Sequence, residues 1–145
     1  MAQLGTTATA PKLTNPRLYP YFTRLSPSST GIVSAMEASI LHYYGEMGKG
    51  WNEIAVISTL FEVTTDSALY FVNSLHEDLS VLTFQQYLVA QETDMSVELQ
   101  EIKNSGARVI VAFVLDLITL LERAEGYELV DEGHVWVVSD APVVV

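Results

Sequence analysis

The chain has 145 residues, of which 49% are apolar and 17% charged, enough apolar material for one domain with a buried core. It carries 7 lysine and arginine residues against 18 aspartate and glutamate residues, a formal net charge of −11. A field of that sign repels phosphate backbones and anionic membrane surfaces, so nucleic-acid binding is excluded. The sequence has no cysteine, which excludes disulfides, a thiol nucleophile and cysteine-based metal sites.

Targeting and metal-binding signals are the next features to consider. The first residues have neither a basic start nor a long apolar run, so we expect no secretory signal here. We expect no membrane span, because the sequence has no run of ~20 uninterrupted apolar residues. His42, His76 and His134 lie far apart in the sequence, so we also expect no metal site.

The N-terminal part predicts a loop, a short strand and then a helix. Residues 1–18 are rich in Thr, Pro and Ala and show little periodicity, which is typical of a loop. Residues 19–25 are aromatic and predict a short strand with Pro20 at its start or on an edge. Residues 26–30 offer several N-cap side chains, and apolar residues then repeat at helical spacing from Ile32 to Tyr44.

The middle of the chain predicts two strands and two helices. Residues 53–58 form an apolar run typical of a strand that is buried on both faces. Asp66 predicts the N-cap of a second helix with Leu69 and Phe71 facing inward. Residues 81–88 alternate loosely and predict a strand. A third helix is expected to begin at Asp94 or Ser96 and to end with Gly106 at the C′ position.

The remaining elements complete an α/β pattern. Residues 108–114 give the clearest buried strand, residues 116–125 a fourth helix, and residues 134–138 the last strand. Strands alternating with helices predict an α/β fold with a mostly parallel sheet and helices on both faces. Ligands of such sheets bind outside the carboxyl ends of the strands. The loops expected there are residues 26–30, 58–65, 89–94, 115–116 and 139–142.

No catalytic constellation emerges from the sequence. A nucleophile elbow of the G-x-S-x-G type is absent, and no serine has a histidine that local spacing would place beside it. One polar cluster has two explanations. The hydroxyls of Ser26, Ser28, Ser29 and Thr30 lie at a helix N-terminus, where free N–H groups favour a carboxylate or another anion. Simple N-capping is the alternative explanation.

Five segments of the chain resemble the motifs of a known family. They are ATAPKL at residues 8–13, YPYFTRLSPS at 19–28, GWNEIAVI at 50–57, NSGARVIV at 104–111 and VWVVSD at 135–140. Together, in this order and spacing, they resemble the receptor-family ligand-binding regions. That family includes the ectodomains of class C G-protein-coupled receptors and natriuretic-peptide receptors, and the bacterial branched-chain amino-acid binding proteins.

The resemblance implies a periplasmic-binding-protein type I fold, in which two α/β lobes close on a ligand in the cleft between them. It assigns residues 26–140 to lobe two of the ligand-binding region. Residues 1–25 would be the end of lobe one and the crossover, and residues 141–145 the start of the return crossover. Most of lobe one is then missing from this chain.

The resemblance also implies the site residues. Thr9 matches the family's hydroxyl that contacts an amino-acid head group, and Asp140 matches the aspartate that reaches the ligand amine. Ser28 and Ser29 stand in the family's PSD motif, where Ser29 replaces the acidic residue. The family's YGE motif is absent, and Phe61 begins the segment that stands in its place. A strand-end carboxylate that caps the following turn is the alternative explanation for Asp140.

We therefore expect the extracellular ligand-binding region of a receptor in the cell membrane, sensing a small polar ligand such as an amino acid. No enzymatic activity and no cofactor are expected. The expected partners are the ligand in the interlobe cleft, the missing lobe one and a second copy in a homodimer. A secreted or periplasmic solute-binding protein of a transport system is the alternative. A flavodoxin-like or response-regulator-like domain would need an acidic cluster or a phosphate loop at the first strand end, and residues 24–26 offer neither.

Overall fold

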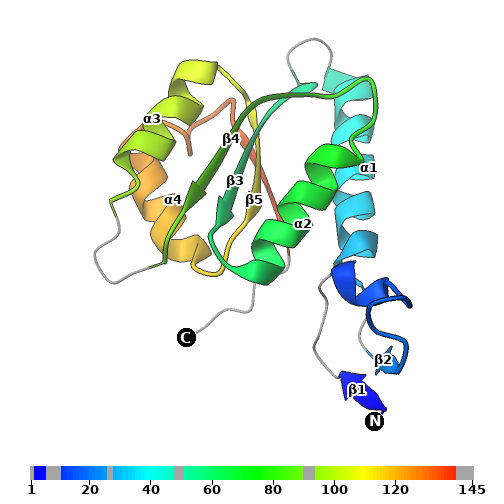
Figure 1. Ribbon diagram of the computed structural model, residues 1–145. Helices are drawn as coiled ribbons and strands as arrows, with labels where there is room; N and C mark the ends of the chain where they lie inside the picture. The colour runs from blue at the N-terminus through cyan, green and yellow to red at the C-terminus, as the bar shows by residue number, and fades with distance from the viewer. Residues whose placement is uncertain (1, 6–10, 26–27, 48–50, 90–93, 140–145) are drawn as a thin grey trace.

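The computed structural model describes residues 2–5, 11–25, 28–47, 51–89 and 94–139 (Figure 1). In chain order these residues form β1 (Gln3–Gly5), the short 3-10 helix η1 (Pro11–Thr14), β2 (Phe22–Arg24), α1 (Ser29–Met47), β3 (Glu53–Thr59), α2 (Glu62–Asn73), β4 (Ser80–Tyr87), α3 (Ser96–Ser105), β5 (Val109–Phe113), α4 (Leu117–Glu125) and β6 (Val135–Val138). From α1 onward, helices and strands alternate as the sequence predicts.

The central sheet has four strands in the order β4-β3-β5-β6, and each neighbouring pair is parallel. The inner strands β3 and β5 pair with Ile54 opposite Val109 and Ser58 opposite Phe113. Every residue of β5 is buried, because helices cover both faces of the sheet. The predicted α/β class with a mostly parallel sheet is therefore confirmed.

Two apolar cores lie on the two faces of this sheet. The helices α1 and α2 cover one face, and α3 and α4 cover the other (Figure 1). Side chains along β5 alternate between the cores, as expected for a strand with a period of two residues. Val111 packs on the α1–α2 side, where the rings of Phe71 and Phe113 lie 5.8 Å apart, and Ile110 packs on the α3–α4 side with Leu120.

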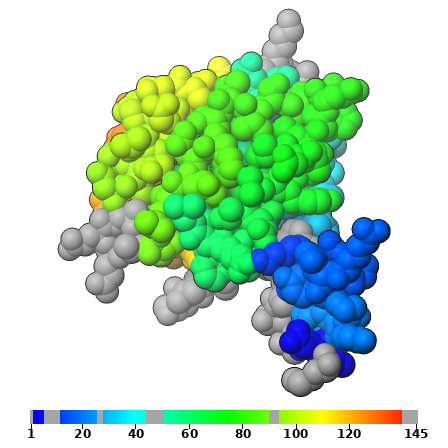
Figure 2. All heavy atoms as spheres, viewed as in Figure 1, coloured from blue at the N-terminus to red at the C-terminus, as the bar shows by residue number. Residues whose placement is uncertain are grey.

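The N-terminal residues form a separate small sheet. β1 and β2 pair in parallel, with Gln3 opposite Phe22 and Gly5 opposite Arg24, and neither strand belongs to the central sheet. This segment extends from the α/β body beside the N-terminal end of α1 (Figures 1 and 2). The predicted strand at residues 19–25 is shorter than expected, because a turn joins Tyr19 to the N–H of Phe22 before the strand begins. The strand β1 falls where the sequence predicts a loop.

The start of α2 differs from the prediction. The helix begins at Glu62, so the predicted N-cap at Asp66 is wrong and this residue lies inside the helix. The first turn closes directly after β3, because the Thr65 N–H donates to the carbonyl oxygen of Phe61 at 2.8 Å. Leu69, expected to face inward, is exposed, and Ala68 contacts the core in its place.

The later helices follow the sequence closely. α3 begins at Ser96 and ends before Gly106, whose φ of 73° is the left-handed conformation expected at this position. α4 begins after Asp116 and ends before Gly126. None of the helices in the described residues is both long and apolar enough to cross a membrane.

Candidate ligand-binding edge of the sheet

The carboxyl ends of the four parallel strands meet at one edge of the sheet, hereafter the carboxyl edge. Its described residues are the strand-end segments 59–61, 87–89, 114–116 and 139. The N-terminal ends of α1 and α2 lie beside this edge (Figure 1). This is the position where open parallel sheets bind ligands, and it is where the sequence places the candidate site.

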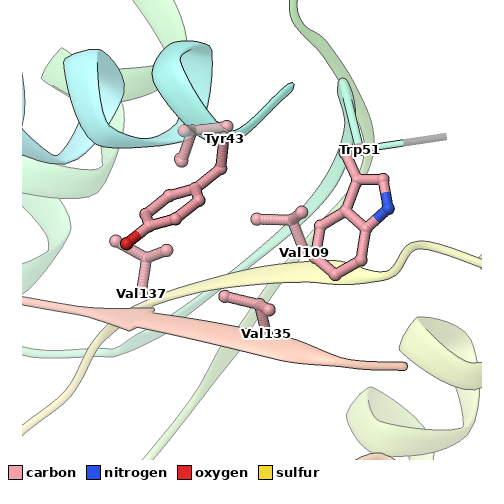
Figure 3. A pocket seen from close by; sticks show the side chains of 6 residues that line it. Tyr43, Trp51, Val109, Val135 and Val137 are labelled. Atoms are coloured by element: carbon pink, nitrogen blue, oxygen red, sulfur yellow. The ribbon is translucent and has the colours of Figure 1, made fainter. Parts of the chain in front are cut away.

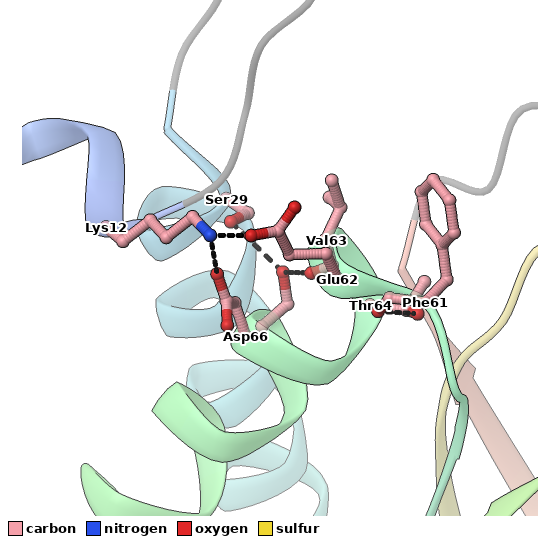
Figure 4. Close-up of polar contacts among 8 residues, drawn as sticks. Lys12, Ser29, Phe61, Glu62, Val63, Thr64 and Asp66 are labelled. Carbon is pink, nitrogen blue, oxygen red and sulfur yellow. Dashed lines mark hydrogen bonds and ion pairs between the residues drawn. The ribbon is translucent and has the colours of Figure 1, made fainter.

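The hydroxyl of Ser29 is buried between two helices. Ser29 is the first residue of α1 and is only 6% exposed. The Ser67 hydroxyl of α2 donates a hydrogen bond to the Ser29 Oγ at 3.1 Å (Figure 4). Its neighbour Ser28 is less buried, and the Ser28 Oγ accepts a long hydrogen bond from the Thr30 N–H at 3.4 Å. Ser29 therefore joins α1 to α2, while Ser28 contributes a weak cap to α1.

Phe61 lies at the carboxyl edge and presents an exposed ring. It is the N-cap residue of α2, with extended backbone, and is 52% exposed. An N-cap normally offers a side-chain oxygen to the helix, and here the Thr64 hydroxyl instead donates to the Phe61 carbonyl oxygen at 2.9 Å. Leu60, Leu88 and Val89 are exposed at the ends of β3 and β4. We refer to these four side chains as the apolar rim.

Two predicted site residues, Thr9 and Asp140, lie outside the described residues. The chain reaches the carboxyl edge at Ser139, whose N–H donates to the Ala112 carbonyl oxygen at 3.1 Å. Of the five predicted residues, the structure thus places Ser28, Ser29 and Phe61 around the N-terminal ends of α1 and α2.

An ion pair connects η1 to the beginning of α2. The Lys12 ammonium group pairs with the Glu62 carboxylate and lies 4.0 Å from Asp66 Oδ2 (Figure 4). This Asp66 oxygen is buried and has no hydrogen-bond partner among the described residues. Lys12 therefore supplies the nearby positive charge. No local pattern in the sequence indicates this contact, because the partners are about 50 positions apart.

A second polar contact joins β4 to α4 across the end of β3. The Tyr87 hydroxyl donates to Asp116 Oδ1 at 2.7 Å. The tyrosine is only 2% exposed, and burial, together with the Asp116 carboxylate, raises the pKa of its phenol far above the ordinary value. The sequence predicts that Asp116 lies in a loop at this edge, but no local pattern indicates its pairing with a residue 29 positions away.

Other polar groups near the end of β3 bond to one another. The Gln86 side-chain amide donates to the Ser58 hydroxyl at 3.1 Å. The hydroxyls of Thr59 and Thr64 lie 2.8 Å apart in a hydrogen bond, and both residues are buried. These bonds stabilise the turn from β3 into α2. The apolar rim and Asp116 are among the described groups of the carboxyl edge that the solvent reaches.

An apolar groove lies at the opposite end of the strands. It has a volume of about 310 Å³ and is lined by Ile40, Tyr43, Trp51, Val109, Val135 and Val137. Tyr43 and Trp51 stand on either side, and the valines of β5 and β6 lie between them (Figure 3). Val109 and Val135 begin their strands, so the groove is at the amino ends. All of its described lining residues are apolar or aromatic.

Comparison with known proteins identifies the family. A family model described as the receptor family ligand binding region matches residues 1–143. The match spans nearly the whole chain, so the chain belongs to this family, as a partial domain. No curated protein matches the chain. The resemblance carried by the five motifs is therefore confirmed, and the α/β body is a lobe of the periplasmic-binding-protein-like type I fold. Members of this family are generally non-catalytic and bind small ligands in a cleft.

Proposed function

We propose that this chain is part of the extracellular ligand-binding region of a membrane receptor that senses a small polar ligand such as an amino acid, without catalysis. The family match over residues 1–143 is the observation that carries the proposal. The shared carboxyl edge supports it, because four strand ends and two helix N-termini lie beside one another there. Ligand binding in the interlobe cleft would shift an equilibrium between open and closed lobes.

The proposed domain organisation follows the separation of the two sheets. Residues 26–140 would form lobe two, which contains the central sheet. Residues 1–25 would be the end of lobe one and the crossover, and residues 141–145 the start of the return. The isolation of β1 and β2 from the central sheet supports this division. Lobe one would then provide the opposite wall of the cleft, facing the carboxyl edge.

The proposed ligand contacts come from both sides of the edge. Thr9 would contact the ligand head group, and Asp140 would accept hydrogen bonds from its amine. Phe61 offers an exposed ring on the apolar rim, and Ser28 a hydroxyl at the start of α1. Ser29 would contribute by holding α1 against α2, since its hydroxyl already bonds to Ser67.

Calorimetric titration of the complete two-lobed ectodomain with the common L-amino acids tests this function. We expect at least one to bind, and Asp140→Ala to weaken that binding by at least about tenfold with little change in melting temperature. Asp131→Ala is the matched control, because Asp131 is an exposed carboxylate before the amino end of β6. Failure of every amino acid to bind would contradict the proposed ligand class, and unaltered affinity would remove Asp140 from the site.

The transcript beyond residue 145 tests the receptor assignment separately. A reading frame that continues into a membrane-spanning segment supports a receptor. A reading frame that completes the second lobe and then stops favours a solute-binding protein.

A further inference from the structure

Asp116 differs in charge from the other described residues of the carboxyl edge. Among the described strand-end segments, residues 59–61, 87–89, 114–116 and 139, it is the only charged residue. It forms no ion pair with any of the described residues, and the residue is partly exposed to solvent. The apolar rim of Leu60, Phe61, Leu88 and Val89 occupies the neighbouring strand ends of the same edge.

The Asp116 carboxylate does not cap its own helix. Aspartate at an N-cap normally accepts a hydrogen bond from a backbone N–H of the first turn. Asp116 occupies this position in α4 but makes no side-chain capping bond. Its Oδ1 instead accepts the bond from Tyr87 on the far side of β3. Such departures from a local rule are expected at functional positions.

Tyr87 can hold the Asp116 carboxylate in one position. Its ring belongs to the core on the α3–α4 side, so the hydroxyl has little freedom to move. The distance of 2.7 Å is that of a well-formed O–H···O hydrogen bond. Because burial raises the pKa of the phenol, the Tyr87 hydroxyl keeps its proton and remains a donor to Asp116 Oδ1. A carboxylate has about four acceptor positions, and the tyrosine occupies one of them on Oδ1.

We propose that Asp116, held in place by Tyr87, receives the protonated amine of a ligand whose apolar part lies against the apolar rim. This inference rests on the proposed function and narrows it to ligands that combine an ammonium group with an apolar side chain. The acid that Ser29 replaces in the family motif would then have a counterpart on another strand end. The net charge of −11 also favours a cationic group over an anionic one.

The test compares ligands that differ only in the amine. The complete two-lobed ectodomain is titrated with L-leucine and with L-2-hydroxyisocaproate, which carries a hydroxyl in place of the amine. The same pair of amino acid and 2-hydroxy acid is used for L-valine and L-phenylalanine. We expect the wild-type protein to bind the amino acid at least about tenfold more tightly.

Asp116→Asn removes the charge and keeps a good N-cap residue, so α4 should form as before. We expect it to abolish most of the preference for the amino acid by weakening that ligand at least about tenfold, while the hydroxy acid binds as before. Tyr87→Phe keeps the ring in the core and should reduce the same preference to a smaller extent. Asp131→Asn is the matched control and should leave both affinities unchanged.

The outcomes separate this inference from the proposed function. If Asp116→Asn and Tyr87→Phe leave the amino-acid preference intact, Asp116 is only a structural link between β4 and α4, and the inference fails while the proposed function stands. If both variants weaken the two ligands equally, the inference fails in the same way. If the wild-type ectodomain binds neither ligand of any pair, the inference fails, and the proposed ligand class fails with it only when the other common L-amino acids do not bind either.

Discussion

The hydroxyls of Ser29 and Ser67 form a hydrogen bond of 3.1 Å between the first turn of α1 and the middle of α2. Both residues are buried, and the surrounding contacts of these helices are largely apolar. The Ser67 Oγ also lies 2.8 Å from the carbonyl oxygen of Val63 in its own helix. This contact holds the start of α1 against α2 beside the candidate site, so it affects the stability of the protein as well as the position of Ser28.

Ser67→Ala should lower the free energy of unfolding by about 1 kcal/mol, because it removes a buried hydrogen bond to Ser29. Ser29→Ala should have a similar effect, and the double variant should cost less than the sum of the two. Urea unfolding of the three proteins measures these values. Ser39→Ala is the control, since the Ser39 hydroxyl is exposed and bonds to the Ala35 carbonyl oxygen of its own helix. Strict additivity would show that the two serines do not interact energetically.

Val111→Asp should prevent folding, because Val111 is fully buried in the inner strand β5 and an aspartate there has no partner for its charge. The expected result is the loss of the cooperative transition in thermal and urea unfolding. Val97→Asp makes the same chemical change at a residue of α3 that is 67% exposed, and it should change stability by less than about 0.5 kcal/mol. A soluble Val111→Asp protein that unfolds cooperatively would contradict the placement of β5.

Gly106→Ala and Gly31→Ala should change stability in opposite directions. A Cβ at either position meets no atom within 4 Å, so packing does not distinguish them. Gly106 has a φ of 73°, where an alanine is strained by about 1–2 kcal/mol. Gly31 lies within α1, where alanine should stabilise the protein by about 0.5–1 kcal/mol. Urea unfolding of both variants checks the pair, and equal effects of the same sign would refute the argument.

Tyr87 should make the protein sensitive to alkaline pH. Burial and the neighbouring Asp116 raise the pKa of its phenol, so the folded protein holds this proton more tightly than the unfolded chain. The resulting stabilisation is complete below the unfolded pKa of about 10 and declines as the pH rises above it. Urea unfolding between about pH 8 and about pH 11 should therefore show a steeper loss of stability for wild type than for Tyr87→Phe. Identical slopes would argue against a buried, protonated Tyr87.

The sequence predicted the central elements of the fold because their signals are local. The continuous apolar run of β5 and the glycine after α3 each specify an element without reference to distant residues. The start of α2 could not be predicted in the same way. Its N-cap is Phe61, which carries no capping signal, and the polar Asp66 offered a false one four residues into the helix. The strand β1 has three residues, too few for a periodicity to be detected.

The sequence was sufficient to predict which edge of the sheet holds the candidate site, but not which side chains contact one another there. A parallel sheet places the ends of its strands together, so the loops at residues 58–65 and 115–116 could be assigned to one edge from the sequence. The bonds between Tyr87 and Asp116 and between Ser29 and Ser67 join residues that are 29 and 38 positions apart. Such pairings depend on the strand order, which local patterns do not specify.

The strand order β4-β3-β5-β6 has a consequence for synthesis of the protein. Of the strands of the central sheet, β3 and β4 are synthesised first and can pair with each other. The other edge of β3 stays unpaired until β5 has been synthesised. That edge stays open until Phe113 has left the exit tunnel, about 50 residues after β3 has emerged. A nascent chain that stalls in α3 would expose this unpaired edge of β3 to chaperones and to other nascent chains.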